Sequence, residues 1–285
     1  MSAEVAQGTP PPKAREMHFE LSEGLASHWC PSHPEFSHAA SAFMAALPHL
    51  EPYFIHNIRE AAEQIEDPRL KQDVELFVAQ EARHAQQHRR LNQLLAVRYP
   101  ELPRLERAIK QRLDHSRRRH SLAFRMAYTS GYEAITYQLV CFMMEARHEW
   151  LTDADPHVLA LLSWHGAEEV EHKAAAFDVL NAIDSSYLLR MRGFVAALAM
   201  TVKDILGMTR YMLRVDGLWG KPESRRRLWR LRLGFLRGLL PRLRHYLAPG
   251  YDPKALKDPD CMLRWVERYH AGEDMNALQF QSLDA

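Results

Sequence analysis

Two Glu-x-x-His sequences lie inside apolar stretches with helical spacing, and this feature restricts the fold more than any other. Residues three and four positions apart share one face of an α-helix. Glu81 and His84 continue the apolar stripe of one such stretch, and Glu169 and His172 continue that of another. Burial of a carboxylate costs several kcal/mol unless another charge compensates it. We therefore expect a charged cluster inside a core of packed helices.

Apolar periodicity predicts helices along most of the chain and almost no strands. We expect helices over 35–64, 68–99, 126–144, 157–183 and 187–213, a solvated basic crossover at 99–120, and a short helix at 262–270. Pro48 and Pro52 should kink or restart the first helix. The sequence thus predicts an all-α protein.

Composition sets the expected organisation of the chain. Residues 1–17 are polar and proline-rich and are expected to form a disordered arm, followed by a helical bundle at 18–213 and a helical extension packed on it at 214–285. No apolar stretch is as long as the about 20 residues that a membrane-spanning helix needs. The first residues also lack the pattern of an export signal. The three cysteines are far apart and odd in number. These features favour a cytoplasmic protein.

Two further acids face the expected core. Glu51 and Glu133 follow apolar residues at helical spacing. Glu145, by contrast, lies twelve residues after Glu133, which turns it by about 120° and moves it by about 18 Å. Its Glu-x-x-His pair with His148 is therefore expected elsewhere. Glu35, in a fourth pair, stands at a helix entrance, where the helix dipole explains an acid.

The buried set reads Glu, Glu-x-x-His, Glu, Glu-x-x-His over four successive helices. Its members are Glu51, Glu81, His84, Glu133, Glu169 and His172. This is the ligand inventory of di-iron and di-manganese carboxylate bundles. Four carboxylates and two neutral imidazoles balance two divalent cations, which removes the cost of burial. The set predicts a di-metal centre.

Three stretches around these residues carry a family resemblance. They are LPHLEPYF at 47–54, QEARHAQQH at 80–88 and WHGAEEVEHKAAAFDV at 164–179. They look like the bacterial ferritin-like family catalogued as predicted metal-dependent hydrolases, over about residues 15–270. The resemblance implies a ferritin-like four-helix bundle with a di-metal centre and additional C-terminal helices. Leu50, where the family usually has Gly, and Pro52 depart from the pattern.

The carboxylate-rich, histidine-poor ligand set resembles that of di-iron oxygenases and oxidases. His165, one turn before Glu169, adds a resemblance to the di-iron arylamine N-oxygenases, which implies that His165 is a seventh metal ligand. We accordingly expect two iron ions, or a Mn/Fe pair, and O2 as co-substrate in an oxygenase or desaturase. Its substrate would be a mostly apolar or aryl small molecule. A metal-dependent hydrolase and a ferritin-like metal-binding protein without enzymatic activity are the alternatives.

Side chains near the ligands could orient them, although we expect no catalytic residue beyond the ligands themselves. Tyr137, Trp164 and Glu168 are such candidates. His88, one turn beyond His84, either has this role or competes with His165 for a metal. The sequence has no nucleotide-binding glycine loop and no cysteine cluster. Electrons for a redox cycle would therefore come from an external electron-transfer protein or from the substrate.

A basic segment follows the expected bundle. Residues 221–244 contain nine basic residues and one acid, a net charge of +8, with leucine and tryptophan between them. This composition is typical of a helix in a membrane interface or against an acidic partner. A solvated helix face is the simpler interpretation. No recognised nucleic-acid-binding module surrounds the segment, so we expect no nucleic-acid partner.

Overall fold

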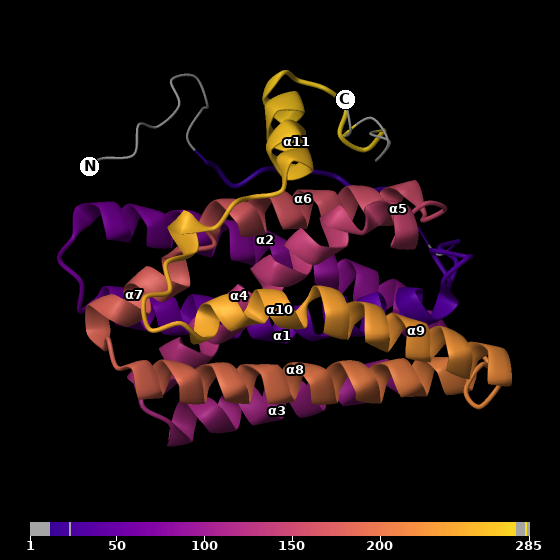
Figure 1. Cartoon of the computed structure of the whole chain (residues 1–285), viewed down its shortest axis with the longest axis horizontal. Coiled ribbons are helices and arrows are strands. Elements are labelled where there is room, and N and C mark those ends of the chain that lie inside the picture. The colour runs from indigo at the N-terminus through magenta and orange to yellow at the C-terminus, as the bar shows by residue number, and fades with distance from the viewer. Residues whose placement is uncertain (1–11, 23, 278–282, 284–285) are drawn as a thin grey trace.

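The computed structural model describes residues 12–22, 24–277 and 283, and the regular elements in these ranges are all helices (Figure 1). The all-α prediction is confirmed. The α-helices are α1 (Pro34–Ala62), α2 (Pro68–Arg98), α3 (Leu102–Arg119), α4 (Leu122–Glu145), α5 (Arg147–Trp150), α6 (Pro156–His172), α7 (Ala175–Ile183), α8 (Tyr187–Val215), α9 (Pro222–Gly238), α10 (Leu240–Leu243) and α11 (Asp260–His270), and the 3-10 helices are η1 (Arg244–Leu247) and η2 (Pro253–Ala255).

Side-chain caps define where four of the helices begin. Asp67, Ser121, Asp155 and Ser186 each accept a hydrogen bond from a backbone N–H in the first turn of the helix that follows. Such caps satisfy backbone donors that have no partner within the helix. The starts of α2, α4, α6 and α8 are therefore encoded locally.

The first and fourth expected helices differ from the prediction. α1 runs without interruption through Pro48 and Pro52, so the prediction of a restart is wrong. Each proline removes one backbone donor, but α1 packs along α2 and α8 over its length, and this packing outweighs the loss. The segment 157–183 is two helices, because the chain breaks at Lys173 and Ala174.

Close helix crossings hold the bundle together. α1 packs against α2, α4 and α8, and α4 packs along α8. At the α4–α8 crossing a Cβ on Gly193 would lie 2.3 Å from the Ala127 carbonyl carbon, and one on Gly131 would lie 2.7 Å from the Phe194 Cα. Glycine at both positions allows the backbones to meet. The basic crossover is α3, which packs on α1.

The two ends of the described chain meet at α6. α11 packs on α6, and the N-terminal segment runs beneath α11 (Figure 1). Residues 1–11 of the expected arm lie outside the described residues, whereas Arg15 is buried. α9 packs on α1. Within the described ranges, no helix combines the length and apolar character needed to cross a bilayer. The ferritin-like arrangement and the division at 213 stay predictions.

Candidate metal centre

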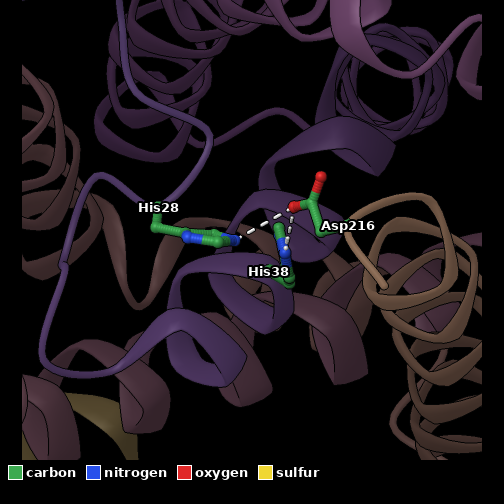
Figure 2. Close-up of side chains that lie close together, drawn as sticks. All are labelled: His28, His38 and Asp216. Atoms are coloured by element: carbon green, nitrogen blue, oxygen red, sulfur yellow. Dashed lines mark hydrogen bonds and ion pairs between the residues drawn. The ribbon is translucent and has the colours of Figure 1, made fainter. Parts of the chain in front are cut away.

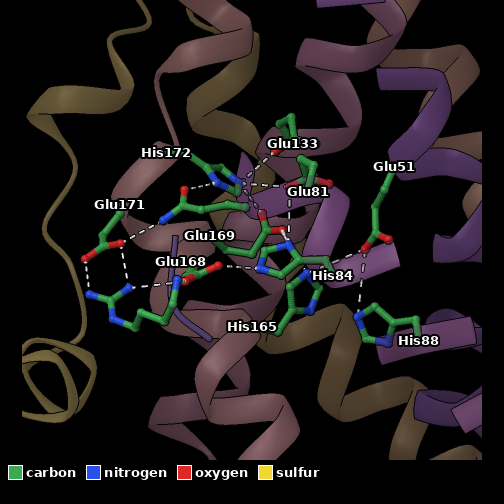
Figure 3. A network of polar contacts seen from close by, with 12 residues as sticks. Glu51, Glu81, His84, His88, Glu133, His165, Glu168, Glu169, Glu171 and His172 are labelled. Carbon is green, nitrogen blue, oxygen red and sulfur yellow. Dashed lines mark hydrogen bonds and ion pairs between the residues drawn. The ribbon is translucent and has the colours of Figure 1, made fainter. Parts of the chain in front are cut away.

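Four helices bring eight histidine and glutamate side chains together inside the bundle (Figure 3). None of the eight is more than 5 % exposed. We call them the bundle cluster: Glu51 from α1, Glu81, His84 and His88 from α2, Glu133 from α4, and His165, Glu169 and His172 from α6. The cluster contains all seven residues that the sequence suggested as metal ligands, together with His88.

One end of the bundle cluster is built around His172. Its Nε2 lies 3.3 Å from Glu81 Oε1, 3.4 Å from Glu133 Oε2 and 3.4 Å from Glu169 Oε2. Three carboxylates from three helices therefore surround one imidazole nitrogen.

The other end contains more histidine. His165 Nε2 lies 3.0 Å from Glu169 Oε1 and 3.9 Å from Glu51 Oε1. His88 Nε2 lies 3.8 Å from the same Glu51 oxygen. The structure thus brings both histidines to Glu51, and only His165 also contacts Glu169.

Two carboxylates connect the ends. His84 Nδ1 lies 3.4 Å from Glu81 Oε1 and 4.0 Å from Glu169 Oε1, and these two acids also approach His172. Carboxylates placed between two groups of ligands suit a pair of cations.

Hydrogen bonds outside the bundle cluster fix the orientation of two of its imidazoles. His172 Nδ1 lies 2.9 Å from Gln80 Oε1, and His84 Nε2 lies 3.0 Å from Glu168 Oε2. When each of these nitrogens donates its proton outward, the other ring nitrogen presents a lone pair to the cluster. Metal-binding histidines are commonly oriented in this way. Glu168 thus contacts His84 from outside the cluster, and the orienting role suggested for it stays a prediction.

Arg15 supports this outer layer. Its backbone N–H donates to Glu168 Oε1 at 2.7 Å, and its guanidinium donates to both oxygens of Glu171 at 2.7 and 2.5 Å. The guanidinium also lies over the rings of Trp265 and Tyr269 of α11. This role could not be predicted from the sequence, since a single arginine in a polar, proline-rich segment has no periodicity to mark it as buried.

The two aromatic candidates differ in their surroundings. The Trp164 ring stands edge-on to His84, with 4.8 Å between ring centroids. The Tyr137 hydroxyl instead donates to Asp258 Oδ1 at 2.9 Å. Trp164 thus packs against the bundle cluster, whereas Tyr137 binds the C-terminal segment. Glu145 forms an exposed ion pair with Arg242 outside the cluster.

Without cations the carboxylates perturb one another. Burial and the charge on Glu81 raise the pKa of Glu51 well above its usual range. Burial and the charge on Glu169 raise the pKa of Glu81 and of Glu133 to about 8. Burial acts in the same direction on Glu169, but the charge of His172 outweighs it and lowers the pKa of that carboxyl. The cluster holds more negative charge than its histidines balance.

Unsatisfied polar atoms test whether metal ions fit here. Buried polar groups almost always have hydrogen-bond partners. The bundle cluster nevertheless has many atoms without one: both oxygens of Glu51, Oε1 of Glu81, Nδ1 of His84, both ring nitrogens of His88, Oε2 of Glu133, Nε2 of His165, Oε2 of Glu169 and Nε2 of His172. Oxygen and imidazole donors of this kind bind divalent cations. The donor set fits metal ions.

The fold and the site define an all-helical protein with a buried histidine–glutamate cluster suited to metal ions. The family model for predicted metal-dependent hydrolases matches residues 13–257, and the chain belongs to this family. No curated protein and no solved structure matches the chain.

The family corrects the predicted reaction. Its description as a predicted metal-dependent hydrolase contradicts the expected oxygenase or desaturase and agrees with the hydrolase alternative. The prediction failed because carboxylate-rich sites with two cations serve both hydrolysis and redox chemistry, so the ligand inventory alone does not separate them. The O2 co-substrate and the external electron donor belonged to the redox interpretation and are set aside with it.

Proposed function

We propose that this protein is a hydrolase that uses two divalent cations in the bundle cluster. Their ligands would be Glu51, Glu81, His84, Glu133, His165, Glu169 and His172. The observation that supports this proposal is the convergence of these buried donors, each of which has an atom without a hydrogen-bond partner. His165 is preferred over His88 because its Nε2 reaches both Glu169 and Glu51.

Charge supports a pair of cations. Two divalent ions would balance the four carboxylates, so that all of them stay ionised in the core. Bound there, the ions would act as Lewis acids toward a substrate oxygen and lower the pKa of a bound water. Iron, manganese and zinc all accept this mixture of donors.

Neighbouring side chains would hold two of the histidine ligands in the orientation that metal binding needs. Gln80 and Glu168 would accept the outward protons of His172 and His84, which keeps the inward nitrogens as neutral donors. Phe77 packs against His172 and Trp164 against His84, with ring centroids 4.9 and 4.8 Å apart. This packing holds the two imidazoles in place. A small apolar or aryl molecule is the substrate class that we propose.

Hydrolysis by a metal without redox chemistry is the direct test. Protein loaded separately with Zn²⁺, Mn²⁺ or Fe²⁺ would be assayed without O2 on aryl carboxylic and phosphoric esters, lactones and amides. We expect turnover by the Zn²⁺ form. Because zinc has no redox chemistry, such turnover would be hydrolytic. Glu169→Gln should abolish turnover, whereas Glu145→Gln, a change in an exposed ion pair, should retain it. A protein with two bound cations that hydrolyses no member of the panel would contradict the proposal.

A further inference from the structure

A second group of histidine and carboxylate side chains lies near the start of α1 (Figure 2). His28 precedes α1, His38 is in the second turn of that helix, and Asp216 directly follows α8. We call these three residues the end cluster. His38 lies thirteen residues before Glu51 on α1, which is about 20 Å along the helix. The end cluster is therefore separate from the bundle cluster.

The end cluster is centred on one carboxylate oxygen. Asp216 Oδ2 lies 3.0 Å from His28 Nε2 and 2.9 Å from His38 Nε2. The Tyr99 hydroxyl donates to the same oxygen at 2.8 Å, and the Arg98 guanidinium donates to Oδ1 at 2.8 and 3.0 Å. Arg98 and Tyr99 hold the carboxylate in place and leave Oδ2 facing both imidazoles.

Hydrogen bonding does not account for His38. Its side chain is fully buried, and neither of its ring nitrogens has a hydrogen-bond partner. Nε2 is close to Asp216 Oδ2 but out of line for a hydrogen bond. The contact with Asp216 Oδ2 is thus the polar contact of the His38 ring, and a cation at Nε2 would give this buried nitrogen a well-directed partner.

We propose that His28, His38 and Asp216 bind one divalent transition-metal ion of the Zn²⁺ type. Two imidazoles and one carboxylate are a zinc ligand set that leaves a position open for water or another ligand. Both histidines direct Nε2 toward Asp216 Oδ2. A cation between these three atoms would be bound by the two Nε2 lone pairs and by the carboxylate oxygen. The His28 side chain is 34 % exposed and gives the ion a route from solvent.

Such an ion would join two parts of the chain that are far apart in the sequence, the stretch with His28 and His38 and the end of α8. Residues 28 and 216 are 188 positions apart, and α1 lies between them. Cross-linking the N-terminal segment to the end of α8 would stabilise the end of the bundle from which α9 begins. The inference is independent of the hydrolytic function, because no residue of the bundle cluster takes part.

Cation counting tests the proposal. Protein stripped of metal would be titrated with Zn²⁺ against a chromophoric chelator and then dialysed for elemental analysis. We expect three ions in the parent protein and two in His28→Ala and in Asp216→Asn. His18→Ala removes an exposed histidine from the same N-terminal segment and should leave three. A Glu81→Gln/Glu169→Gln variant should lose the bundle ions and keep one, so that failure of either site is seen separately.

The His28→Ala variant tests the proposal even if substitution of a buried residue disturbs folding. His28 lies in a loop and is partly exposed, so His28→Ala should keep the parent circular dichroism spectrum. Co²⁺ bound to the Glu81→Gln/Glu169→Gln variant should show an absorption band that His28→Ala removes. The same number of ions and the same affinity in the parent protein and in folded His28→Ala would overturn the proposal.

A different observation concerns α9. Its buried residues Leu228 and Leu231 face the bundle. The opposite side carries large apolar side chains that are 40–59 % exposed: Trp229, Leu233, Leu236 and, at the start of α10, Leu240. At 100° per residue these four form one stripe along the helix axis. We call this stripe and its flanking arginines the basic face.

Arginines flank the stripe on both sides. By the same helical geometry, exposed Arg225 and Arg232 lie on one side and exposed Arg226, Arg230 and Arg237 on the other. An apolar stripe between basic rows is the pattern of helices that lie in a membrane interface. A second copy of the chain would bring one strongly basic segment against another, so charge disfavours self-association through this face.

We infer that the basic face docks on an anionic lipid surface. The parent protein should sediment with vesicles of phosphatidylcholine containing about a third phosphatidylglycerol and stay in solution with phosphatidylcholine alone, because the arginines need anionic headgroups. High salt should weaken the binding, since it screens these charges.

Matched variants separate the face from net charge. Arg225→Ala/Arg226→Ala/Arg230→Ala and Trp229→Ser/Leu236→Ser should each reduce vesicle binding at least tenfold. The variant Arg107→Ala/Arg118→Ala/Arg119→Ala removes three exposed charges from α3 and should bind like the parent. No sedimentation of the parent with anionic vesicles, or equal losses in the α3 and α9 variants, would overturn the inference.

Discussion

The two histidine–carboxylate clusters differ in how much they depend on a cation. The bundle cluster places four carboxylates in a core without basic side chains to balance them all. The end cluster has one carboxylate, which Arg98 and Tyr99 already bind. In the bundle cluster, cations would balance the negative charge of the carboxylates. In the end cluster, a cation would instead supply a partner for the buried imidazole of His38. The same residue types thus give sites of different dependence on metal.

Metal removal should have the largest effect and should act through the bundle cluster. Cations at about a thousandfold their dissociation constant add about 4 kcal/mol to the free energy of unfolding. For a chain of this size, loss of that term lowers Tm by roughly 10 °C. Thermal unfolding followed by circular dichroism, with Zn²⁺ and with a chelator, measures the shift.

Removal of two carboxylates should reduce this dependence. Glu81→Gln/Glu133→Gln takes two negative charges from the bundle cluster, so its Tm should change less on chelation than that of the parent protein. If chelation left the parent Tm unchanged, the contrast between the two clusters would be lost.

Substitution of Asp216 should have the next largest effect, and it should appear even without metal. Asp216→Asn weakens the bonds to Arg98, Tyr99 and His28, and we expect a loss of about 2 kcal/mol from the free energy of unfolding in chelator. Urea denaturation gives the value. Glu145→Gln, in an exposed ion pair, should cost less than about 1 kcal/mol. Equal costs for the two substitutions would contradict the structural role of Asp216.

Gln80→Leu should weaken metal binding in the bundle cluster without removing a ligand. The substitution takes away the acceptor for His172 Nδ1, and loss of such an orienting partner costs about 10–100-fold in affinity. Competition with a chelator measures the dissociation constant, and saturating metal should still give the parent stoichiometry. Gln86→Leu changes an exposed glutamine on α2 and is the control. Equal affinities in the two variants would exclude an orienting role for Gln80.

Asp153 should have the smallest effect, with a defined dependence on pH. It accepts hydrogen bonds from Ser32 at 2.7 and 2.9 Å near the loop of His28. Burial acts to raise its pKa, but the bonds from Ser32 and Cys30 outweigh burial and hold the pKa of Asp153 below its ordinary value. The carboxylate thus stabilises the folded chain above about pH 4, and this contribution is lost as the pH falls through the lowered pKa.

The measurement is Tm of the parent protein and of Asp153→Asn at several pH values. The variant should be slightly less stable at pH 7, and the difference should vanish as the medium becomes more acidic than pH 4. A difference that grew on acidification would have the wrong sign for a lowered pKa.

The bundle cluster could be predicted from the sequence because the ligands on each helix are close together in the sequence. Helical spacing places Glu81 with His84, and Glu169 with His172, on one face each, and burial of those faces brings them together. The same reasoning separated Glu145 from Glu133. Sequence periodicity is sufficient where each helix contributes its ligands within two turns.

The end cluster could not be predicted in this way. His38 follows Glu35 by three residues at the start of α1, and this spacing gives no sign of His28 or Asp216. Only the packing of α1 against the end of α8 brings the three together. Arg15 was missed for the same reason. α1 also continues through Pro48 because tertiary contacts outweigh the local preference. Helical periodicity does not predict contacts between segments that are distant in the sequence.

A crystal structure of the Zn²⁺-loaded protein, with anomalous scattering measured at the zinc edge, tests the central claim most directly. We expect two strong anomalous peaks inside the bundle cluster, with nitrogen or oxygen atoms of Glu51, Glu81, His84, Glu133, His165, Glu169 and His172 about 2.0–2.3 Å from them. A third peak is expected at the end cluster. Fully Zn²⁺-exposed crystals with no anomalous peak among the bundle carboxylates would contradict the proposal that this protein is a two-metal hydrolase.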